Sequence, residues 1–583
     1  MPEEWTFADL LRSVAQRGEA PAIIQFDVHG QASWSYAAIA RQVEALVHIL
    51  RQAGLQRSQP VALWAPNSPR WIVAALAIIA AGGVLVALDD LATADEVAAS
   101  LKASTARLVL IAPGHLAATA AMLQACGIVA MPLNAATVLP QRQPAAGTET
   151  LPQPTPDDPA LFGWTSGTTG AAKGFLLSQR NIASNVQALC GLNIVGPHDR
   201  VLQPLPLHHA YPLVVGMLTP LAIGACIVLP ADATGPSLQQ ALHEGEISII
   251  VGVPRLYEAL LAAIRQRIAL RGRMMHALWR LMLRSTIWVQ RHSRLDPGRL
   301  CFRRVRRAVA PRLRYLVSGG APLDRDVEEQ LNALGWTVLV GYGLAETASL
   351  FTGNRPQARR VGTAGRPLAG GAIRIADPDA NGIGEIELRG PSVTQGYVND
   401  PGANQHAFTP DGWLRTGDLG FVDSEGFLHV TGRSKEILVL GGGKKVNPEE
   451  LERIYGSAPE IREIAVLEER GRLVALVRPD HDRVHRLGTL NLREGVRIAL
   501  ASVARSLPAS QHLAGFVLTD DPLPRTRLGK YRRFLLPALY RRALSGTPSR
   551  AAHPLSPEDQ ALLRDPTAGA IWKLKSSDAA PLC

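Results

Sequence analysis

The hydrophobic positions between residues 23 and 158 follow two alternating patterns. Amphipathic stretches with helical spacing, such as Tyr36–Ala53 and Ala94–Ala103, alternate with short apolar runs, such as Pro60–Trp64 and Ala106–Ile111. Short apolar runs bounded by turn residues are typical of buried strands. Their alternation with helices predicts a parallel sheet that is covered by helices.

The chain after residue 174 continues with the same pattern and then changes. Ile247–Val253 and Leu313–Ser318 are expected core strands, whereas the sequence beyond Asn354 is rich in glycine and in strand-like segments separated by turns such as DSEG at 423–426. We therefore predict an α/β fold. A large N-terminal domain, residues 1–432, combines doubly wound α/β subdomains with a β-rich, barrel-like subdomain. A small α+β C-terminal domain covers residues 433–543, and a linker-like tail with one helix at Pro557–Arg564 covers residues 544–583.

The apolar run Trp71–Leu88 is uncharged and almost long enough to cross a bilayer. Gly82 and Gly83 divide it into an alanine-rich half and a short β-branched half. This division favours a buried helix that ends at glycine and is followed by a core strand, with a membrane span as the alternative.

Composition excludes several classes of protein. A chain of 583 residues needs several domains, and 47% hydrophobic residues are enough for large buried cores. The five cysteines show no paired spacing, which argues against a disulfide framework or a zinc site. The first residues, MPEEWTFADLL, carry acidic groups where a secretory signal would be basic. These features predict a cytoplasmic protein.

The net charge of +11 is concentrated in one segment. Between Arg265 and Arg314 there are fifteen arginines and a single acidic residue, Asp296, with Met, Leu and Trp interleaved. Basic amphipathic helices bind anionic membrane surfaces, so peripheral contact with the inner face of the membrane is one interpretation. A solvated helical face over an ordinary core is the other. No nucleic-acid-binding motif accompanies the charge, so nucleic acid is not an expected partner.

The sequence WTSGTTGAAKG at 164–174 has the composition of a phosphate-binding loop. Glycine lets backbone N–H groups converge on an anion, hydroxyls add donors, and lysine adds positive charge. It differs from the common P-loop because Ala171 and Ala172 separate Gly170 from Lys173. Taken alone, a run of this composition more often forms a flexible surface loop, so the phosphate interpretation needs support from other parts of the chain.

Further sequences support the phosphate loop because they occur in a recognisable order. They are PLHHAYP at 206–212, VPRLYEAL at 253–260, SGGAPL at 318–323, GYGLAET at 341–347, GWLRTGDLG at 412–420, GRSKE at 432–436 and LPRTRLGKYRR at 523–533. The set resembles the adenylate-forming (AMP-binding) superfamily and, within it, the long-chain fatty acid–CoA ligases. The resemblance covers roughly residues 5–540.

The resemblance implies a two-step reaction. A carboxylate attacks the α-phosphate of ATP, with Mg²⁺, to give an acyl adenylate and pyrophosphate, and the thiol of coenzyme A then displaces AMP. The first step brings two anions together, so the site must neutralise negative charge. The implied substrate is a medium- or long-chain fatty acid.

The resemblance also assigns roles to residues. The phosphates are cradled by Thr165, Ser166, Gly167, Thr168, Thr169, Gly170 and Lys173. Gly320, Ala321 and Pro322 form a wall beside adenine, Tyr342 stacks on the base, and Asp418 and Arg433 contact the ribose or phosphates. Glu346 is the Mg²⁺ ligand, a role that suits a hard carboxylate oxygen. His208, His209 and Tyr211 lie beside the acyl pocket; two adjacent histidines without a third ligand do not indicate a metal site.

Two lysines of the C-terminal domain are linked by the resemblance to catalysis and motion. Lys530 bridges the carboxylate and the α-phosphate, and Lys435 marks the hinge about which the small, mobile domain rotates between the two steps. After rotation, the glycine loop 441–443 with Lys444 and Lys445 would face CoA. The simpler interpretation of that loop is a mobile hairpin tip.

One departure from the family pattern leaves the acceptor open. Ala345 stands where these ligases usually have threonine, which removes one hydroxyl donor to the α-phosphate and costs up to about tenfold in rate. The sequence GYGLAE also resembles fatty acyl-AMP ligases, which load an acyl carrier protein. The sequence GRSKEILVLGGGKKVNPEELE is more similar to the CoA-using enzymes. Transfer to coenzyme A is therefore the favoured function, and carrier loading is the alternative.

Overall fold

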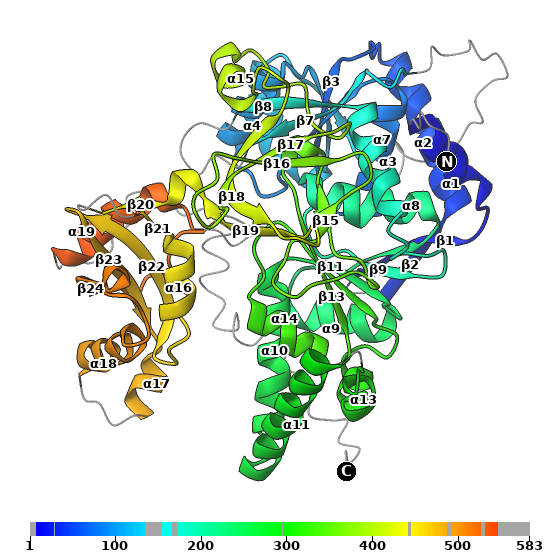
Figure 1. Cartoon of the computed structure of the whole chain (residues 1–583). Helices are drawn as coiled ribbons and strands as arrows, with labels where there is room; N and C mark the ends of the chain where they lie inside the picture. Colours follow the sequence, from blue (N-terminus) through cyan, green and yellow to red (C-terminus); the bar gives the residue numbers. More distant parts are fainter. Residues whose placement is uncertain are drawn as a thin grey trace.

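The computed structural model describes residues 7–27, 30–134, 154–165, 173–293, 295–440, 445–486, 491–525 and 531–545. Figure 1 shows a large body formed by the elements up to β19 and, beside it, a smaller unit formed by the elements from β20 onward. The helix predicted at Pro557–Arg564 lies outside the described residues.

The largest sheet has nine strands and a parallel centre. Its order is β15 (Arg366–Pro367), β14 (Thr352–Gly353), β13 (Thr337–Tyr342), β12 (Tyr315–Ser318), β11 (Ile249–Gly252), β9 (Arg200–Leu202), β10 (Cys226–Leu229), β1 (Pro21–Asp27) and β2 (Gly30–Ser35). The strands from β13 to β1 pair in parallel, whereas β2, β14 and β15 add antiparallel edges. Parallel strands place their carboxyl ends at one edge, where the loops after β11, β12 and β13 meet.

A second sheet of six strands repeats this plan. Its order is β6 (Val129–Pro132), β5 (Leu108–Ile111), β3 (Pro60–Trp64), β4 (Val84–Ala87), β7 (Pro159–Trp164) and β8 (Gly174–Ser178). Its strands pair in parallel except for the antiparallel hairpin of β7 and β8. The expected strand Pro60–Trp64 is confirmed residue for residue.

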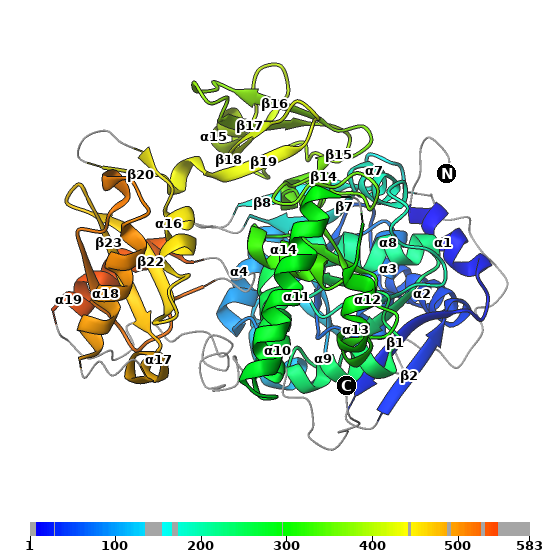
Figure 2. The ribbon, with the colours of Figure 1, turned by 60° about the horizontal axis from the view of Figure 1, so that its bottom comes forward.

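Helices cover both sheets (Figure 2). They are α1 (Phe7–Gln16), α2 (Tyr36–Gln52), α3 (Pro69–Ala80), α4 (Ala94–Ser104), α5 (Pro113–Ala125), α7 (Gln179–Cys190), the π-helix η1 (Pro212–Leu218), α8 (Thr219–Ile223), α9 (Gly235–Glu244), α10 (Pro254–Ala269), α11 (Arg273–His292), α12 (Gly298–Cys301), α13 (Arg303–Val309), α14 (Arg325–Ala333) and α15 (Pro401–Ala407). The largest cluster of buried hydrophobic residues joins both sheets through α2, α3, α7 and η1.

The apolar run Trp71–Leu88 forms the buried helix α3 and strand β4, as predicted. Gly82 between them has φ +86°, a conformation that favours glycine. Side chains all around α3 are buried because it is enclosed by the two sheets and α2. No helix within the described part of the chain combines the length and apolarity needed to span a bilayer.

The β-rich segment is an antiparallel meander of β16 (Ala372–Ala376), β17 (Gly384–Arg389), β18 (Leu414–Val422) and β19 (Leu428–Arg433). Within the described residues β16 and β19 do not pair with each other, so the meander is open. Gly426, in the predicted DSEG turn between β18 and β19, has φ +83°.

The C-terminal unit follows the short 3₁₀ turn η3 (Ser434–Glu436). It contains the ribbon β20 (Leu438–Val439) with β21 (Lys445–Val446), the sheet of β22 (Ile461–Glu469), β23 (Arg472–Pro479) and β24 (Gly515–Leu518), and the helices α16 (Pro448–Tyr455), α17 (His481–Arg486), α18 (Leu492–Ala504) and α19 (Leu536–Leu544). It has two hydrophobic clusters of its own. The predicted α/β and α+β classes are confirmed, and the boundary at 432/433 stays a prediction.

A buried acid on α14 makes stability depend on pH. Burial raises the pKa of Glu328 to about 7 although the charges of Arg359 and Arg325 act in the opposite direction, and no described cation forms a direct ion pair with its carboxyl group. The folded state therefore binds this proton more tightly than the unfolded chain does. Stability from this group is present below the ordinary glutamate pKa of about 4.3 and is lost as the pH rises through 7.

We therefore expect Glu328→Gln to raise the free energy of unfolding at pH 8 by about 1–3 kcal/mol, with little effect at pH 4. The glutamine oxygen can still accept the N–H of Gly362, which now lies 2.9 Å from Glu328 Oε2. Denaturant unfolding of both proteins at pH 8 and at pH 4 measures this change in the free energy of unfolding. Glu329→Gln is the matched control and should destabilise, since Glu329 pairs with Arg291 at 2.6 Å and with Arg325 at 3.3 Å. An E328Q protein no more stable than wild type at pH 8 would contradict the assignment.

Candidate active site

The segment that the sequence predicts to bind phosphate connects β7 to β8, which pair as an antiparallel hairpin. Thr165 and Lys173 close its base, because the Thr165 N–H donates to the Lys173 carbonyl at 2.9 Å and the Lys173 N–H donates to Thr165 Oγ1 at 3.0 Å. The predicted phosphate residues Ser166, Gly167, Thr168, Thr169 and Gly170 lie outside the described residues. The hairpin stem thus fixes both ends of the loop at the surface of the second sheet.

Tyr397, which the sequence did not single out, joins Lys173 to Glu346. Its hydroxyl donates to Glu346 Oε1 at 3.0 Å, and its ring centroid lies 5.4 Å from Lys173 Nζ. The backbone positions both ends: Tyr397 forms a β-bridge with Phe175 of β8, and the Thr394 N–H donates to the Glu346 carbonyl at 2.8 Å. Only its place after Gly396, in the segment GPSVTQGYVND, could have drawn attention to it.

Glu346 has the environment of a cation ligand. It lies in the 3₁₀ turn η2 (Ala345–Thr347), directly after β13, and its side chain is half-buried. Burial raises the pKa of its carboxyl, and it forms no ion pair with any described residue. Arg433 is near enough to stabilise its charge but is not in direct contact, and a partly desolvated carboxylate of this kind fits a divalent ion, since Mg²⁺ is typically held by one or two carboxylates plus phosphates and water. No group of three or more His, Cys, Asp or Glu side chains in the described chain is arranged to hold a metal.

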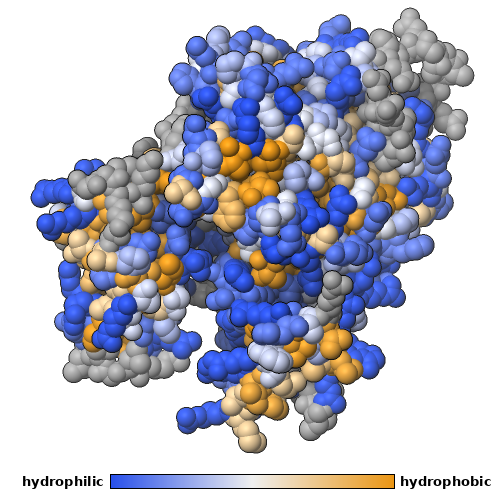
Figure 3. Space-filling model, viewed as in Figure 1, coloured by the Kyte–Doolittle hydropathy of each residue, from blue (hydrophilic) through white to orange (hydrophobic). Residues whose placement is uncertain are grey.

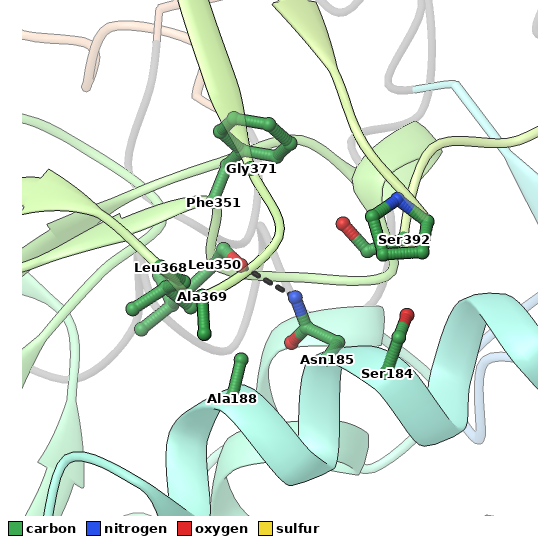
Figure 4. A pocket seen from close by; sticks show the side chains of 10 residues that line it. Ser184, Asn185, Ala188, Leu350, Phe351, Leu368, Ala369, Gly371 and Ser392 are labelled. Atoms are coloured by element: carbon green, nitrogen blue, oxygen red, sulfur yellow. Dashed lines mark hydrogen bonds between the residues drawn. The ribbon is translucent and has the colours of Figure 1, made fainter. Parts of the chain in front are cut away.

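The loop that follows Glu346 has a strained backbone and is hydrogen-bonded to helix α7. Ala348 and Ser349 have φ values of +58° and +132°, which non-glycine residues rarely adopt. Asn185 of α7 spans this pair, since its Nδ2 donates to the Leu350 carbonyl at 2.6 Å and lies 3.5 Å from the Thr347 carbonyl. Figure 4 shows Asn185 reaching toward Leu350 across a small pocket between α7 and this loop. Gly343 is required here, because a Cβ would lie 1.9 Å from the Ser349 carbonyl oxygen.

Tyr342, Asp418 and Arg433 form one hydrogen-bonded group. The Tyr342 hydroxyl donates to Asp418 Oδ2 at 2.7 Å, and Arg433 Nε donates to Asp418 Oδ1 at 2.9 Å. Asp418 and Arg433 are cross-strand partners on β18 and β19, whereas Tyr342 ends β13. Burial alone would lower the pKa of Arg433, but Asp418 and neighbouring acids raise it, so the guanidinium stays charged. Three predicted nucleotide residues from two sheets therefore meet at one carboxylate.

The glycine-rich segment after β12 lies against Tyr211. A Cβ on Gly319 would lie 2.8 Å from the Tyr211 ring, so the tyrosine packs directly on the backbone that leads into Gly320, Ala321 and Pro322. The Tyr211 hydroxyl lies 3.1 Å from the carbonyl oxygens of Gly252, the last residue of β11, and Val317, the last but one of β12. Tyr211 is buried and its hydroxyl is engaged, so only its ring is free to shape a neighbouring pocket.

His208 and His209 precede η1 with their ring centroids 4.1 Å apart. Burial lowers the pKa of His209 to about 4 and that of His208 well below its ordinary value, so both imidazoles are neutral at pH 7. The closest carboxylate oxygen to His208, Asp89 Oδ2, is 3.9 Å away. The pair therefore contributes polar but uncharged surface.

Of the two predicted lysines of the C-terminal unit, only Lys435 lies among the described residues. Lys530 lies outside the described residues, between Arg525 and Tyr531, whose side chains hydrogen-bond to each other. Lys435 is the middle residue of η3, at the passage from β19 to the C-terminal unit. Of the glycine loop, residues 441–444 lie outside the described part.

Comparison with known proteins identifies the family. The model of the family described as AMP-binding enzyme matches residues 10–398, which is more than half of the chain. The chain belongs to the AMP-binding enzymes. The matched residues include β7, β13 and Tyr397, whereas Asp418 and Arg433 follow them.

Curated relatives of this AMP-binding enzyme differ in the acid they are named for. A long-chain-fatty-acid–CoA ligase of Mycobacterium bovis is 31% identical over 457 residues, 74% of each chain. A sulfoacetate–CoA ligase of Cupriavidus necator is 31% identical over 447 residues, covering 74% of this chain and 79% of the relative. An indoleacetate–CoA ligase of Aromatoleum aromaticum is 30% identical over 521 residues, which cover 86% of this chain and 92% of the relative. These relatives support an AMP-forming CoA ligase without deciding its acid.

Solved structures agree on the fold. The crystal structure of ATP-bound MatB from Rhodopseudomonas palustris is 25% identical, with a TM-score of 0.72, and covers 91% of this chain and 99% of its own. The O-succinylbenzoate coenzyme A synthetase of Bacillus subtilis, in complex with ATP and magnesium ion, is 22% identical, with a TM-score of 0.70 and coverage of 91% and 99%. This AMP-binding enzyme thus has the fold of adenylate-forming ligases.

The Tyr397–Glu346 contact can be tested in this AMP-binding enzyme. We expect Tyr397→Phe to lower the rate of pyrophosphate release about three- to tenfold, the value of one lost hydrogen bond, because the ring beside Lys173 stays in place. Tyr397→Ala should cost more, since the ring is lost as well. Steady-state assays at saturating ATP measure both. Equal rates for Tyr397→Phe and wild type would show that the hydroxyl does not position Glu346.

Proposed function

We propose that this enzyme activates a medium- or long-chain fatty acid with ATP and transfers it to coenzyme A, releasing pyrophosphate and AMP. The arrangement of Lys173 directly before β8, Glu346 in the turn after β13 and the group around Asp418 within β18 supports adenylation. The uncharged state of His208 and His209 supports an apolar acid. A dianionic acid such as sulfoacetate would gain no cation from this segment.

The first step forms a bond between a carboxylate oxygen of the acid and the α-phosphorus of ATP, and the bond to the pyrophosphate oxygen breaks. Lys173 and the hairpin loop bind the phosphates that leave. Asp418 accepts hydrogen bonds from the ribose hydroxyls, and Tyr342 packs against the base. Magnesium, held by Glu346, would supply positive charge to the phosphate oxygens.

The second step breaks the bond between the acyl carbon and the oxygen that links it to the α-phosphorus in the acyl adenylate. The thiolate of coenzyme A attacks that carbon, a C–S bond forms, and AMP leaves with the oxygen. We assign Lys530 to stabilising the charge of the first step. Rotation of the C-terminal unit about Lys435 would then withdraw Lys530 and bring residues 441–445 toward coenzyme A.

Carrier-protein loading is the second candidate. Ala345 supports it, because the sequence GYGLAE, which contains this alanine, resembles fatty acyl-AMP ligases. Coenzyme A as the acceptor is supported instead by relatives that are 31% identical to this chain and are named as CoA ligases. The two functions share the adenylation step and differ only in the thiol.

The deciding experiment follows two products in parallel. Purified enzyme is incubated with ATP, Mg²⁺, palmitate and coenzyme A, and pyrophosphate and palmitoyl-CoA are measured, with octanoate, sulfoacetate and indoleacetate as comparison acids. We expect both products with palmitate and little of either with sulfoacetate. Pyrophosphate without palmitoyl-CoA would support the carrier-loading ligase. Turnover confined to sulfoacetate or indoleacetate would refute the fatty-acid assignment while leaving a CoA ligase.

A further inference from the structure

Helix α11 carries two apolar faces, of which only one belongs to the core. Trp279, Leu283 and Thr286 are buried, and this face packs on α10 and α14, with Trp279 edge-on to Phe302. A surface helix needs one such stripe to attach it to a protein. The first face therefore accounts for the folding of α11.

The second face points away from the protein. Met274, Leu278, Leu281 and Trp288 are 87%, 47%, 64% and 63% exposed. At about 100° per residue they fall within roughly 80° of arc, on the side opposite Trp279 and Leu283. We call these four residues the outer stripe. Figure 3 shows apolar residues on the end of the molecule where α11 projects.

Further exposed leucines flank α11 in the sequence. Leu270 before the helix, and Leu295 and Leu300 after it, are exposed by 82%, 70% and 78%. Single exposed apolar side chains are common on soluble proteins, but gathered ones of this size mark a site of contact.

Arginines run along one side of the outer stripe. Arg273, Arg280, Arg284 and Arg291 lie within about 40° of arc, roughly a quarter turn from it. Arg291 pairs with Glu329, whereas Arg273, Arg280 and Arg284 are exposed and have no ion-pair partner among the described residues. Helix α11 itself contains no acidic residue.

We propose that the outer stripe of α11 docks on the surface of an anionic lipid bilayer, with its apolar side chains at the acyl boundary and the arginines among the headgroups. A bilayer surface is the partner that matches both halves of this surface at once. Nucleic acid would use the arginines and leave Met274, Leu281 and Trp288 unexplained, and a second copy of this basic helix would bring like charges together. The helix lies on the membrane without crossing it.

Co-sedimentation with vesicles tests the proposal. The full chain is mixed with vesicles of phosphatidylcholine alone or of phosphatidylcholine with phosphatidylglycerol, at low and high salt. We expect binding to the anionic vesicles that weakens with salt. Leu278→Ser/Leu281→Ser/Trp288→Ser and Arg273→Glu/Arg280→Glu/Arg284→Glu should each weaken it at least about tenfold. All six positions are exposed, so thermal melting should match wild type.

The matched control makes the same charge change elsewhere. Arg472, Arg483 and Arg505 of the C-terminal unit are exposed and have no ion-pair partner among the described residues, so Arg472→Glu/Arg483→Glu/Arg505→Glu should bind vesicles nearly as wild type does. Equal loss in this control would overturn the proposal in favour of net charge alone. So would vesicle binding unaffected by the serine variant, tighter binding to a DNA duplex, or a solution dimer that the serine variant dissociates. None of these readouts depends on which acid the enzyme activates.

Discussion

Replacing Glu346 by glutamine is expected to slow pyrophosphate release by about a hundredfold or more at saturating ATP. Glutamine keeps an oxygen that can accept the Tyr397 hydroxyl, now 3.0 Å from Glu346 Oε1, and removes only the negative charge. Loss of one preorganised electrostatic contact of this kind typically costs 10²–10³ in rate. The rate should fall much further than in Tyr397→Phe, which removes the hydrogen bond and keeps the charge.

Magnesium dependence distinguishes a ligand from a structural acid. In the Glu346→Gln enzyme the Mg²⁺ concentration for half-maximal rate should rise, and in wild type it should rise as the pH falls, because burial raises the pKa of this carboxyl and protons then compete with the cation. Glu44→Gln, on the exposed face of α2, is the control and should behave as wild type. An unchanged Mg²⁺ requirement in Glu346→Gln would refute the metal assignment.

Replacing Arg533 by methionine is expected to destabilise the C-terminal unit by about 3–5 kcal/mol. Its guanidinium makes a bidentate contact with Glu452, at 2.9 and 2.8 Å, and its Nε lies 3.2 Å from Glu436 Oε2. The Glu436 and Glu452 side chains are only 8% and 9% exposed. Without the arginine, two carboxylates would remain buried with no cation in direct contact, which is why the loss is large.

Two further variants isolate the cause. Arg533→Met combined with Glu436→Gln and Glu452→Gln should regain most of the lost stability, because no uncompensated charge remains buried. Arg532→Met, one residue earlier and without an ion pair in the described structure, is the matched control. Denaturant unfolding measures all three, and the deficit of Arg533→Met should shrink at low pH, where the carboxylates are protonated. A deficit within about 0.5 kcal/mol of the control would contradict this account.

Local pattern predicted the elements well, because it reflects local physics. Pro60–Trp64 is a strand because five apolar residues between turns can be buried on both faces, and the glycines after Trp71 end a helix at the predicted place. The sequence also predicted one site for Tyr342, Asp418 and Arg433, because their short motifs occur in order, and their role in nucleotide binding stays a prediction. Tyr342, Asp418 and Arg433 meet although 91 residues separate the first from the last.

The contacts that the sequence missed are long-range and carry no local signal. Tyr397 is one aromatic residue in a loop, and its partner Glu346 is 51 positions away. Arg533 received no role from the sequence, and its partners are 81 and 97 positions earlier. The pattern along α11 could not separate the buried stripe from the exposed one, since both consist of similar residues.

The Arg533 contact also shows where this chain can be divided for separate expression. Because Arg533 joins Glu436 to α16, the end of η3 belongs to the C-terminal piece. Ser434 instead donates to the Gly417 carbonyl of β18 at 3.0 Å and belongs to the N-terminal piece. A cut after Glu436 would leave each fragment with an exposed half of an ion pair, whereas a cut beside Lys435 leaves both fragments with their own partners. Fusion, labelling or cross-linking of the two pieces should be planned around that single residue.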